Sequence, residues 1–136
     1  KAYICCGLNN GVYADDFWRF DPSTGIWTQL RNISDTSGES YDDEYAIARV
    51  SAATFVLDGS AYLTCGESGS LCTDTWKYSP STDLWENVAK FKGVSRKAQA
   101  SFSNDKRGFV LAGMSGLIRF DDVWEFHPDE YDKDDY

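Results

Sequence analysis

The chain has 136 residues, a formal net charge of −9 and 42% hydrophobic residues, values that suit one packed globular domain. Its acidic balance lacks the basic footprint that nucleic acid or an anionic membrane surface requires, so neither is expected as a partner. No run approaches the roughly 18 apolar residues of a membrane helix, so membrane insertion is not expected.

The acidic charge is concentrated near the end of the chain. From Asp121 onward the sequence holds eight acidic residues and one lysine, whereas acids and bases nearly balance before it. At the other end, the sequence opens inside an apolar, strand-like segment and shows no signal peptide. We therefore expect a processed or truncated start.

Residues 1–30 are predicted to form three strands, an incomplete version of a four-stranded unit. A short apolar strand comes first, and a hairpin follows. Trp18 and Phe20 share one face of a strand while Arg19 faces the other way, which is the period-two pattern of β-structure. Pro22 cannot continue a hydrogen-bonded ladder and begins a turn, after which a new strand starts.

A polar, acidic insertion of about a dozen residues follows at positions 31–46 and is predicted to be an exposed loop. Its carboxylates are the hard oxygen ligands that calcium prefers. Their spacing fits no known calcium loop, so a solvated loop is the favoured interpretation. The carboxylates are Asp35, Glu39, Asp42, Asp43 and Glu44.

The rest of the chain holds one complete unit and one partial unit. Residues 47–89 are predicted to form four strands in up-and-down order, and residues 90–93 connect them to the next unit. Residues 94–128 supply three strands, after which an acidic tail, 129–136, stands in place of a fourth. The predicted count is ten strands, grouped as three, four and three.

The three units are copies of one repeat. Equivalent positions in the last two units lie 47 or 48 residues apart, and four-stranded units near this length are typical of β-propeller blades. The repeated tryptophans are interpreted as packing residues, and the repeated aspartates as residues that cap or close a turn. The repeated positions are Gly7, Gly66 and Gly113; Trp18, Trp76 and Trp124; Trp27 and Trp85; and Asp16, Asp74 and Asp122.

Two features of the units resemble the kelch repeat: a strand that ends in a small residue and Gly, and a hairpin of the form aromatic-x-aromatic-x-Pro, which is followed by a later Trp in the first two units but not in the third. Cys6, Cys65 and Ala112 depart from the pattern, which usually has Gly there, and Ser79 and His127 stand where Asp is usual. The chain is similar to secreted or surface kelch proteins of Bacteroidetes-type bacteria. The resemblance implies an all-β fold, a partial kelch-type β-propeller with four-stranded antiparallel up-and-down blades.

About two and a half blades cannot close a ring, because propellers have about four to eight. Three alternatives stay open: the chain is a piece of a longer propeller, copies of it self-associate to close the ring, or its tail caps the fold. The resemblance also implies an extracytoplasmic location, periplasmic or at the cell surface.

Two arginines, Arg49 and Arg96, occupy matching positions at the start of the predicted innermost strand. The resemblance implies that they line the mouth of a central channel, where the planar guanidinium suits an acidic ligand. The alternative is that each forms an ion pair with an aspartate of a neighbouring blade.

The cysteines are expected to be free and structural. Cys5 and Cys6 are adjacent on a strand and should point to opposite faces, and no Cys-x-x-Cys spacing exists, so no metal site is predicted. Cys65 and Cys72 flank a short hairpin and could form a disulfide in an oxidising compartment.

No catalytic residue and no cofactor is predicted. His127 is the single histidine, which cannot supply the copper ligands of the galactose-oxidase type of kelch enzyme or a convincing serine-hydrolase triad. The favoured function is a non-enzymatic module that presents loops and channel-mouth arginines to a protein or glycan partner. The alternatives are part of a sugar-active propeller enzyme similar to sialic-acid mutarotases, with catalytic residues largely outside this chain, and a spacer without a ligand.

Overall fold

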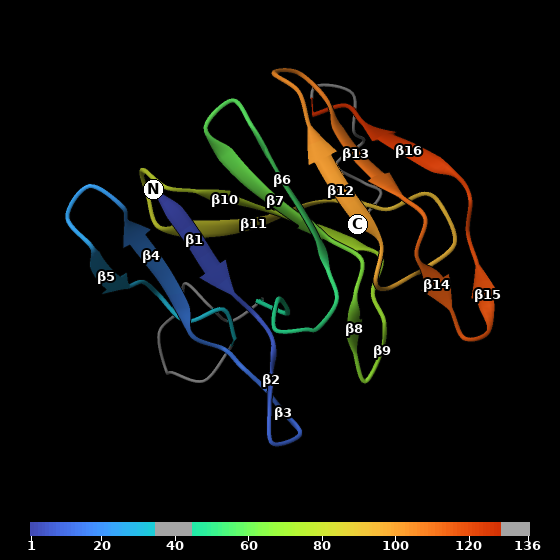
Figure 1. Cartoon of the computed structure of the whole chain (residues 1–136), viewed down its shortest axis with the longest axis horizontal. Helices are drawn as coiled ribbons and strands as arrows, with labels where there is room; N and C mark the ends of the chain where they lie inside the picture. The colour runs from blue at the N-terminus through green and yellow to red at the C-terminus, as the bar shows by residue number, and fades with distance from the viewer. Residues whose placement is uncertain (35–44, 129–136) are drawn as a thin grey trace. The chain divides into compact units, whose positions relative to one another are not determined.

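The structure is a computed structural model that describes residues 1–34 and 45–128 (Figure 1). Within those ranges the chain forms strands, turns and bridges without a helix, so the predicted all-β class is confirmed. The five carboxylates of the insertion and the acidic tail lie outside the described residues. The chain divides into two compact units, an N-terminal unit of residues 1–50 and a C-terminal unit of residues 51–136.

The N-terminal unit contains one three-stranded antiparallel sheet and one small hairpin. Its strands are β1 (Ala2–Cys5), β2 (Leu8–Asn9), β3 (Val12–Tyr13), β4 (Phe17–Asp21) and β5 (Ile26–Gln29). The sheet has the order β1-β4-β5, and β2 pairs with β3. The Asp21 carboxylate accepts hydrogen bonds from the backbone N–H and the hydroxyl of Ser23, which shapes the β4–β5 turn. An antiparallel bridge between Ser34 and Ala46 closes the base of the insertion.

The first sheet of the C-terminal unit has four antiparallel strands in the order β11-β10-β7-β6, with a small hairpin between β7 and β10. The strands are β6 (Ala53–Leu57), β7 (Ser60–Thr64), β8 (Glu67–Ser68), β9 (Ser70–Leu71), β10 (Asp74–Ser79) and β11 (Leu84–Lys90). Burial alternates along β6, where Ala53, Phe55 and Leu57 face the core and the residues between them are exposed.

The second sheet of the C-terminal unit has three antiparallel strands, with a small hairpin between its second and third. The strands are β12 (Ala100–Ser103), β13 (Gly108–Leu111), β14 (Met114–Ser115), β15 (Ile118–Arg119) and β16 (Val123–Phe126). The sheet has the order β12-β13-β16, and β14 pairs with β15. Across the described part of the chain, the three larger sheets therefore hold three, four and three strands, as predicted.

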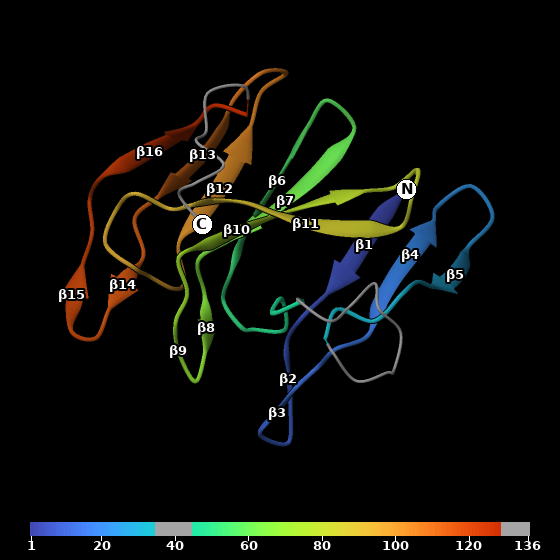
Figure 2. The ribbon, with the colours of Figure 1, turned by 180° about the vertical axis from the view of Figure 1, so that it is seen from behind.

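The two sheets of the C-terminal unit pack against each other, with β6 beside β12 (Figure 2). Phe55 stacks on Tyr62 with ring centroids 5.5 Å apart, and Phe126 contacts both rings. Gly108 makes room for this cluster, because a Cβ at that position would lie 2.4 Å from the Phe55 ring. The hydroxyl of Ser101 on β12 accepts a hydrogen bond from the N–H of Thr54 on β6 and donates one to the carbonyl of the same residue.

The innermost strands begin later than the sequence indicated. The prediction placed Arg49 and Arg96 at the start of the innermost strands, whereas β6 and β12 start four residues after these arginines. The reason is a left-handed residue at equivalent positions: φ is 56° at both Ser51 and Ala98. A residue with positive φ cannot continue an extended ladder, so each arginine lies in a connection that precedes its strand.

Candidate binding surface and the buried arginines

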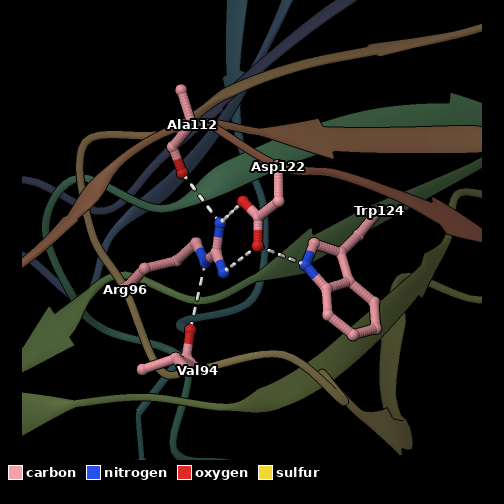
Figure 3. Close-up of polar contacts among 5 residues, drawn as sticks. All are labelled: Val94, Arg96, Ala112, Asp122 and Trp124. Atoms are coloured by element: carbon pink, nitrogen blue, oxygen red, sulfur yellow. Dashed lines mark hydrogen bonds and ion pairs between the residues drawn. The ribbon is translucent and has the colours of Figure 1, made fainter. Parts of the chain in front are cut away.

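Arg96 is the centre of a buried polar network (Figure 3). Its Nε donates a hydrogen bond to the Val94 carbonyl at 3.0 Å, and its Nη1 donates to the Ala112 carbonyl at 2.9 Å. Nη1 and Nη2 also donate to the two carboxylate oxygens of Asp122, the latter at 2.9 Å. The indole N–H of Trp124 donates to the same carboxylate at 2.8 Å. The guanidinium is thus satisfied from inside the protein.

Two aromatic rings complete the surroundings of Arg96. Its guanidinium carbon lies 4.1 Å from the centroid of Phe120 and 5.0 Å from that of Phe91, both within cation–π range. The hydrogen bonds from Arg96 are the main reason why the pKa of Asp122 falls to about 2, and the indole of Trp124 contributes to the same shift. Asp122 is therefore a carboxylate throughout the ordinary pH range.

Arg49 repeats part of this arrangement in the N-terminal unit. It is also fully buried, and its Nε donates to the Ile47 carbonyl at 2.9 Å, just as Nε of Arg96 donates to the carbonyl two residues earlier. Its Nη2 donates to the Ala46 carbonyl at 2.7 Å. The spacing of 47 residues in the sequence therefore corresponds to one conserved local geometry of the two side chains.

The backbone of each arginine is tied to the preceding repeat. The carbonyl of Arg49 accepts a hydrogen bond from the N–H of Gly7 at 3.0 Å, and the carbonyl of Arg96 accepts one from Gly66 at 2.9 Å. The same bond forms in both places although the insertion separates only the first pair. These contacts connect the start of each repeat to the residues that follow strand β1 or β7 of the preceding repeat.

These contacts bear on the predicted ligand role of the arginines. For Arg96 the structure contains an ion pair with an aspartate, and Asp122 comes from the same repeat as the arginine and not from a neighbouring one. Binding of an acidic ligand by Arg49 and Arg96 stays a prediction, and such a ligand would have to displace the internal partners described above.

The positions where kelch repeats usually have a first glycine hold other residues in a glycine-like backbone conformation. φ is 69° at Cys6, 60° at Cys65 and 57° at Ala112, and each is followed by a glycine that also has positive φ. Gly113 is the most constrained of these glycines, because a Cβ there would lie 2.9 Å from the Cβ of Gln99. The repeated pair of left-handed residues ends the second strand of each unit.

The repeated aspartates have a partner that the sequence analysis missed. Each accepts a hydrogen bond from the indole N–H two residues later, and the signal was present as Asp-x-Trp in all three repeats. The distance is 2.6 Å for Asp16 and Trp18 and 2.8 Å for Asp122 and Trp124. The third pair is Asp74 with Trp76. The aspartates thus orient the tryptophans at the start of each hairpin strand.

All four cysteines are free thiols, so the structure holds no Cys65–Cys72 disulfide. Cys65 is fully buried, whereas the Cys72 thiol points to the Ser70 carbonyl at 3.7 Å. The expectation that Cys5 and Cys6 face opposite ways was wrong, because β1 ends at Cys5 and Cys6 is left-handed. A hydrogen bond between the two thiols raises the pKa of Cys5 and lowers the pKa of Cys6.

The described ranges contain few groups of side chains that could bind a metal ion or carry out catalysis. Residues 1–34 and 45–128 contain no group of three or more His, Cys, Asp or Glu side chains that could hold a metal ion. His127 lies beside Glu125, with Nε2 3.5 Å from Oε1. In the same ranges no helix has the length and apolar character needed to cross a membrane.

The small hairpins carry exposed apolar side chains. On the β14–β15 hairpin, Leu117 is 97% exposed and Ile118 is 61% exposed. On the β2–β3 hairpin, Leu8 and Val12 are exposed as well. Each hairpin directly follows a pair of residues with positive φ. These two residues end the preceding strand and turn the chain into a hairpin that extends beyond the sheet.

Comparison with known proteins agrees with this geometry. Residues 1–34 match the kelch motif. The chain is 24% identical to kelch domain-containing protein 10 of Rattus norvegicus and to the protein of the same name of Mus musculus, in alignments that cover 93% of the chain. It spans 32% and 30% of those proteins, about a third of their length. With its kelch-motif match, repeated strand pattern and paired left-handed residues, the chain is similar to kelch-repeat proteins, and its all-β sheets are consistent with part of a kelch β-propeller.

Proposed function

We propose that the chain is a non-enzymatic binding module whose small hairpins contact a protein partner. Kelch repeats generally mediate protein interactions, and residues 1–34 of this chain match the kelch motif. The observation that carries the proposal is the exposure of Leu117 and Ile118 at the tip of the β14–β15 hairpin. Apolar side chains that reach fully into solvent contribute most when a partner covers them.

The β14–β15 hairpin is held in place by the connection that precedes β12 and by Gly113. The backbone groups of Met114 and Lys97 exchange two hydrogen bonds, at 2.9 and 3.0 Å, and the N–H of Phe120 donates to the carbonyl of Gly113 at 3.0 Å. A hairpin fixed at both ends loses little conformational freedom when it binds, which favours affinity. The Lys97 ammonium adds an ion pair with Glu67 of the β8–β9 hairpin at 2.6 Å.

Proteins captured from cells by the full-length protein provide the test. The double variant Leu117→Ser/Ile118→Ser should lose one or more partners that the wild type retains. Ile26→Ser, which changes an exposed apolar residue of β5 that belongs to none of the small hairpins, should keep them. Each partner should then bind the purified wild type and bind the hairpin variant at least tenfold more weakly. Equal capture by all three proteins would refute a hairpin contact.

A glycan partner, an extracytoplasmic location and a bacterial source stay predictions from the resemblance. The same holds for the sugar-active enzyme alternative, whose catalytic residues were expected largely outside this chain. The exposed apolar hairpins support a protein partner more directly than a sugar, because sugar recognition relies on convergent polar groups around an aromatic platform.

A further inference from the structure

A cleft of about 490 Å³ lies in the C-terminal unit, at the end of its sheets away from the small hairpins. Its walls include the turn between β6 and β7 and the turn between β12 and β13. The strand registers show that these turns lie at one end of the two sheets, since Leu57 pairs with Ser60 and Ser103 with Gly108. The β8–β9 and β14–β15 hairpins leave from the other end (Figure 1).

Three cationic side chains line this cleft: Lys77, Lys106 and Arg107. Arg107 already has a partner, because its Nε lies 3.2 Å from the carboxylate of Glu125. The ammonium groups of Lys77 and Lys106 have no hydrogen-bond or ion-pair partner in the part of the chain that the structure describes. Two unpaired cations in one concave site form an attractive position for an anionic group.

The two aspartates of the cleft are explained by the turns that contain them. Asp58 has φ 47° and precedes Gly59 with φ 76°, a conformation in which Asp-Gly is among the favoured residue pairs. Asp105 lies in a turn that the side-chain oxygen of Asn104 closes by accepting two backbone hydrogen bonds, at 2.9 and 2.8 Å. No such backbone requirement explains the lysines.

We propose that this cleft is a second binding site, which takes a short acidic peptide with a carboxylate held between Lys77 and Lys106. The volume lies within the range of about 300–1,000 Å³ that is usual for ligand sites. Pro128 lies beside the cations, over a floor formed by the buried Leu57 and Tyr62, which suits a small apolar peptide side chain next to the carboxylate. The net charge of −9 repels an extended polyanion, so the ligand is a short segment and not nucleic acid.

Fluorescence anisotropy with defined probes tests the site on the full-length protein. The first probe is a fluorescein-labelled heptapeptide with two glutamates flanking a leucine, and the matched control peptide has glutamines in their place. The wild type should bind the acidic peptide at least tenfold more tightly than the control peptide, and less tightly as salt concentration rises. A labelled ten-residue oligothymidine is the third probe.

Charge-matched variants assign the binding to the cleft. Lys77→Gln/Lys106→Gln should weaken binding of the acidic peptide at least tenfold, whereas Arg19→Gln/Lys90→Gln, which removes the same charge elsewhere, should leave it within twofold. Thermal melting checks that both variants are folded. Equal loss in both variants, equal binding of the glutamine peptide, or tighter binding of the oligothymidine through the same lysines would overturn the proposal. The hairpin variant Leu117→Ser/Ile118→Ser should bind the peptide normally, which separates this site from the proposed hairpin contact.

Discussion

Arg96 and Asp122 form a two-pronged ion pair in which the arginine side chain is fully buried while 38% of the aspartate side chain remains exposed. The carboxylate also accepts the indole N–H of Trp124, so one acidic group orients two side chains. The guanidinium also donates hydrogen bonds to the carbonyls of Val94 and Ala112. The arginine therefore connects the first residues of its repeat to the end of strand β13. The Arg96–Asp122 ion pair therefore connects segments of the same blade and stabilises it.

Replacement of the carboxylate tests this role. Asp122→Asn should lower the free energy of unfolding by about 1–3 kcal/mol, because a buried guanidinium would lose its countercharge while the exposed side of the pair limits the penalty. Chemical denaturation of the full-length protein measures the change. Asp121→Asn removes the same charge from the exposed neighbouring position and should change stability by less than about 0.5 kcal/mol. Equal effects of the two substitutions on stability would contradict the view that the Arg96–Asp122 ion pair stabilises the blade.

The same ion pair predicts a dependence of stability on pH. The folded-state pKa of Asp122 is about 2, below the value of about 3.9 in an unfolded chain. A depressed carboxyl pKa contributes stability that is present above the unfolded pKa and lost as the pH falls toward the folded value. The stability difference between wild type and Asp122→Asn should therefore be full at pH 6 and shrink between about pH 4 and pH 2. A difference that stays constant over this range would rule out the ionised pair as its source.

The repeat made much of this architecture predictable. Because Trp18, Trp76 and Trp124 recur with a following Pro in period-two segments, and the first two also with a later Trp, the strands of the hairpins follow from sterics and hydrogen bonding alone. The grouping into three, four and three strands follows from the same alignment, and so does the equivalence of Arg49 and Arg96. Repetition amplifies a weak local signal, since three copies rarely agree by chance.

What the sequence concealed lies mostly in backbone conformation. Ser51 and Ala98 have positive φ, although neither residue type favours this conformation. The local sequence therefore contained no signal that the strands start later. The burial of Arg49 could not be predicted from the sequence either, because a guanidinium just before a strand can bind a ligand or donate hydrogen bonds to carbonyls of its own chain. By contrast, Gly108 inside an apolar strand was a usable signal of close packing.

The free thiols predict a specific pattern of chemical reactivity. Cys72 is partly exposed and should react with a thiol reagent such as Ellman's reagent in the folded protein, whereas the buried Cys65 should react only after unfolding. Mass spectrometry of the labelled peptides separates this label from any label on the partly exposed Cys5 and Cys6, and the variant Cys72→Ser should remove only the label at residue 72. If Cys65 and Cys72 stay unreactive in denaturant until a reductant is added, the two residues form the disulfide that the structure lacks.

Gly108 should be intolerant of any side chain, because its Cα faces the ring of Phe55 across the two sheets of the C-terminal unit. Gly108→Ala should lower the free energy of unfolding by about 1–3 kcal/mol, since the added methyl would lie 2.4 Å from the ring and force one sheet to shift. Denaturant unfolding of Gly108→Ala, Phe55→Leu and the double variant measures the coupling. The double variant should lose less stability than the sum of the single variants. Additive losses would show that the methyl group does not meet Phe55.

Ala112 offers the opposite outcome, a substitution that should stabilise. Its φ of 57° costs an L-residue about 1–2 kcal/mol, and replacement by glycine removes this cost while adding about 0.5–1 kcal/mol of chain entropy to the unfolded state. Ala112→Gly should therefore raise the free energy of unfolding by up to about 1 kcal/mol, with its backbone bonds to Arg96 and Asp122 retained. Ala100→Gly, within the extended strand β12, should lower it by about 0.5–1 kcal/mol. Because φ is positive at residue 112 and not at residue 100, losses of equal size at both would show that residue 112 is not held in the left-handed conformation.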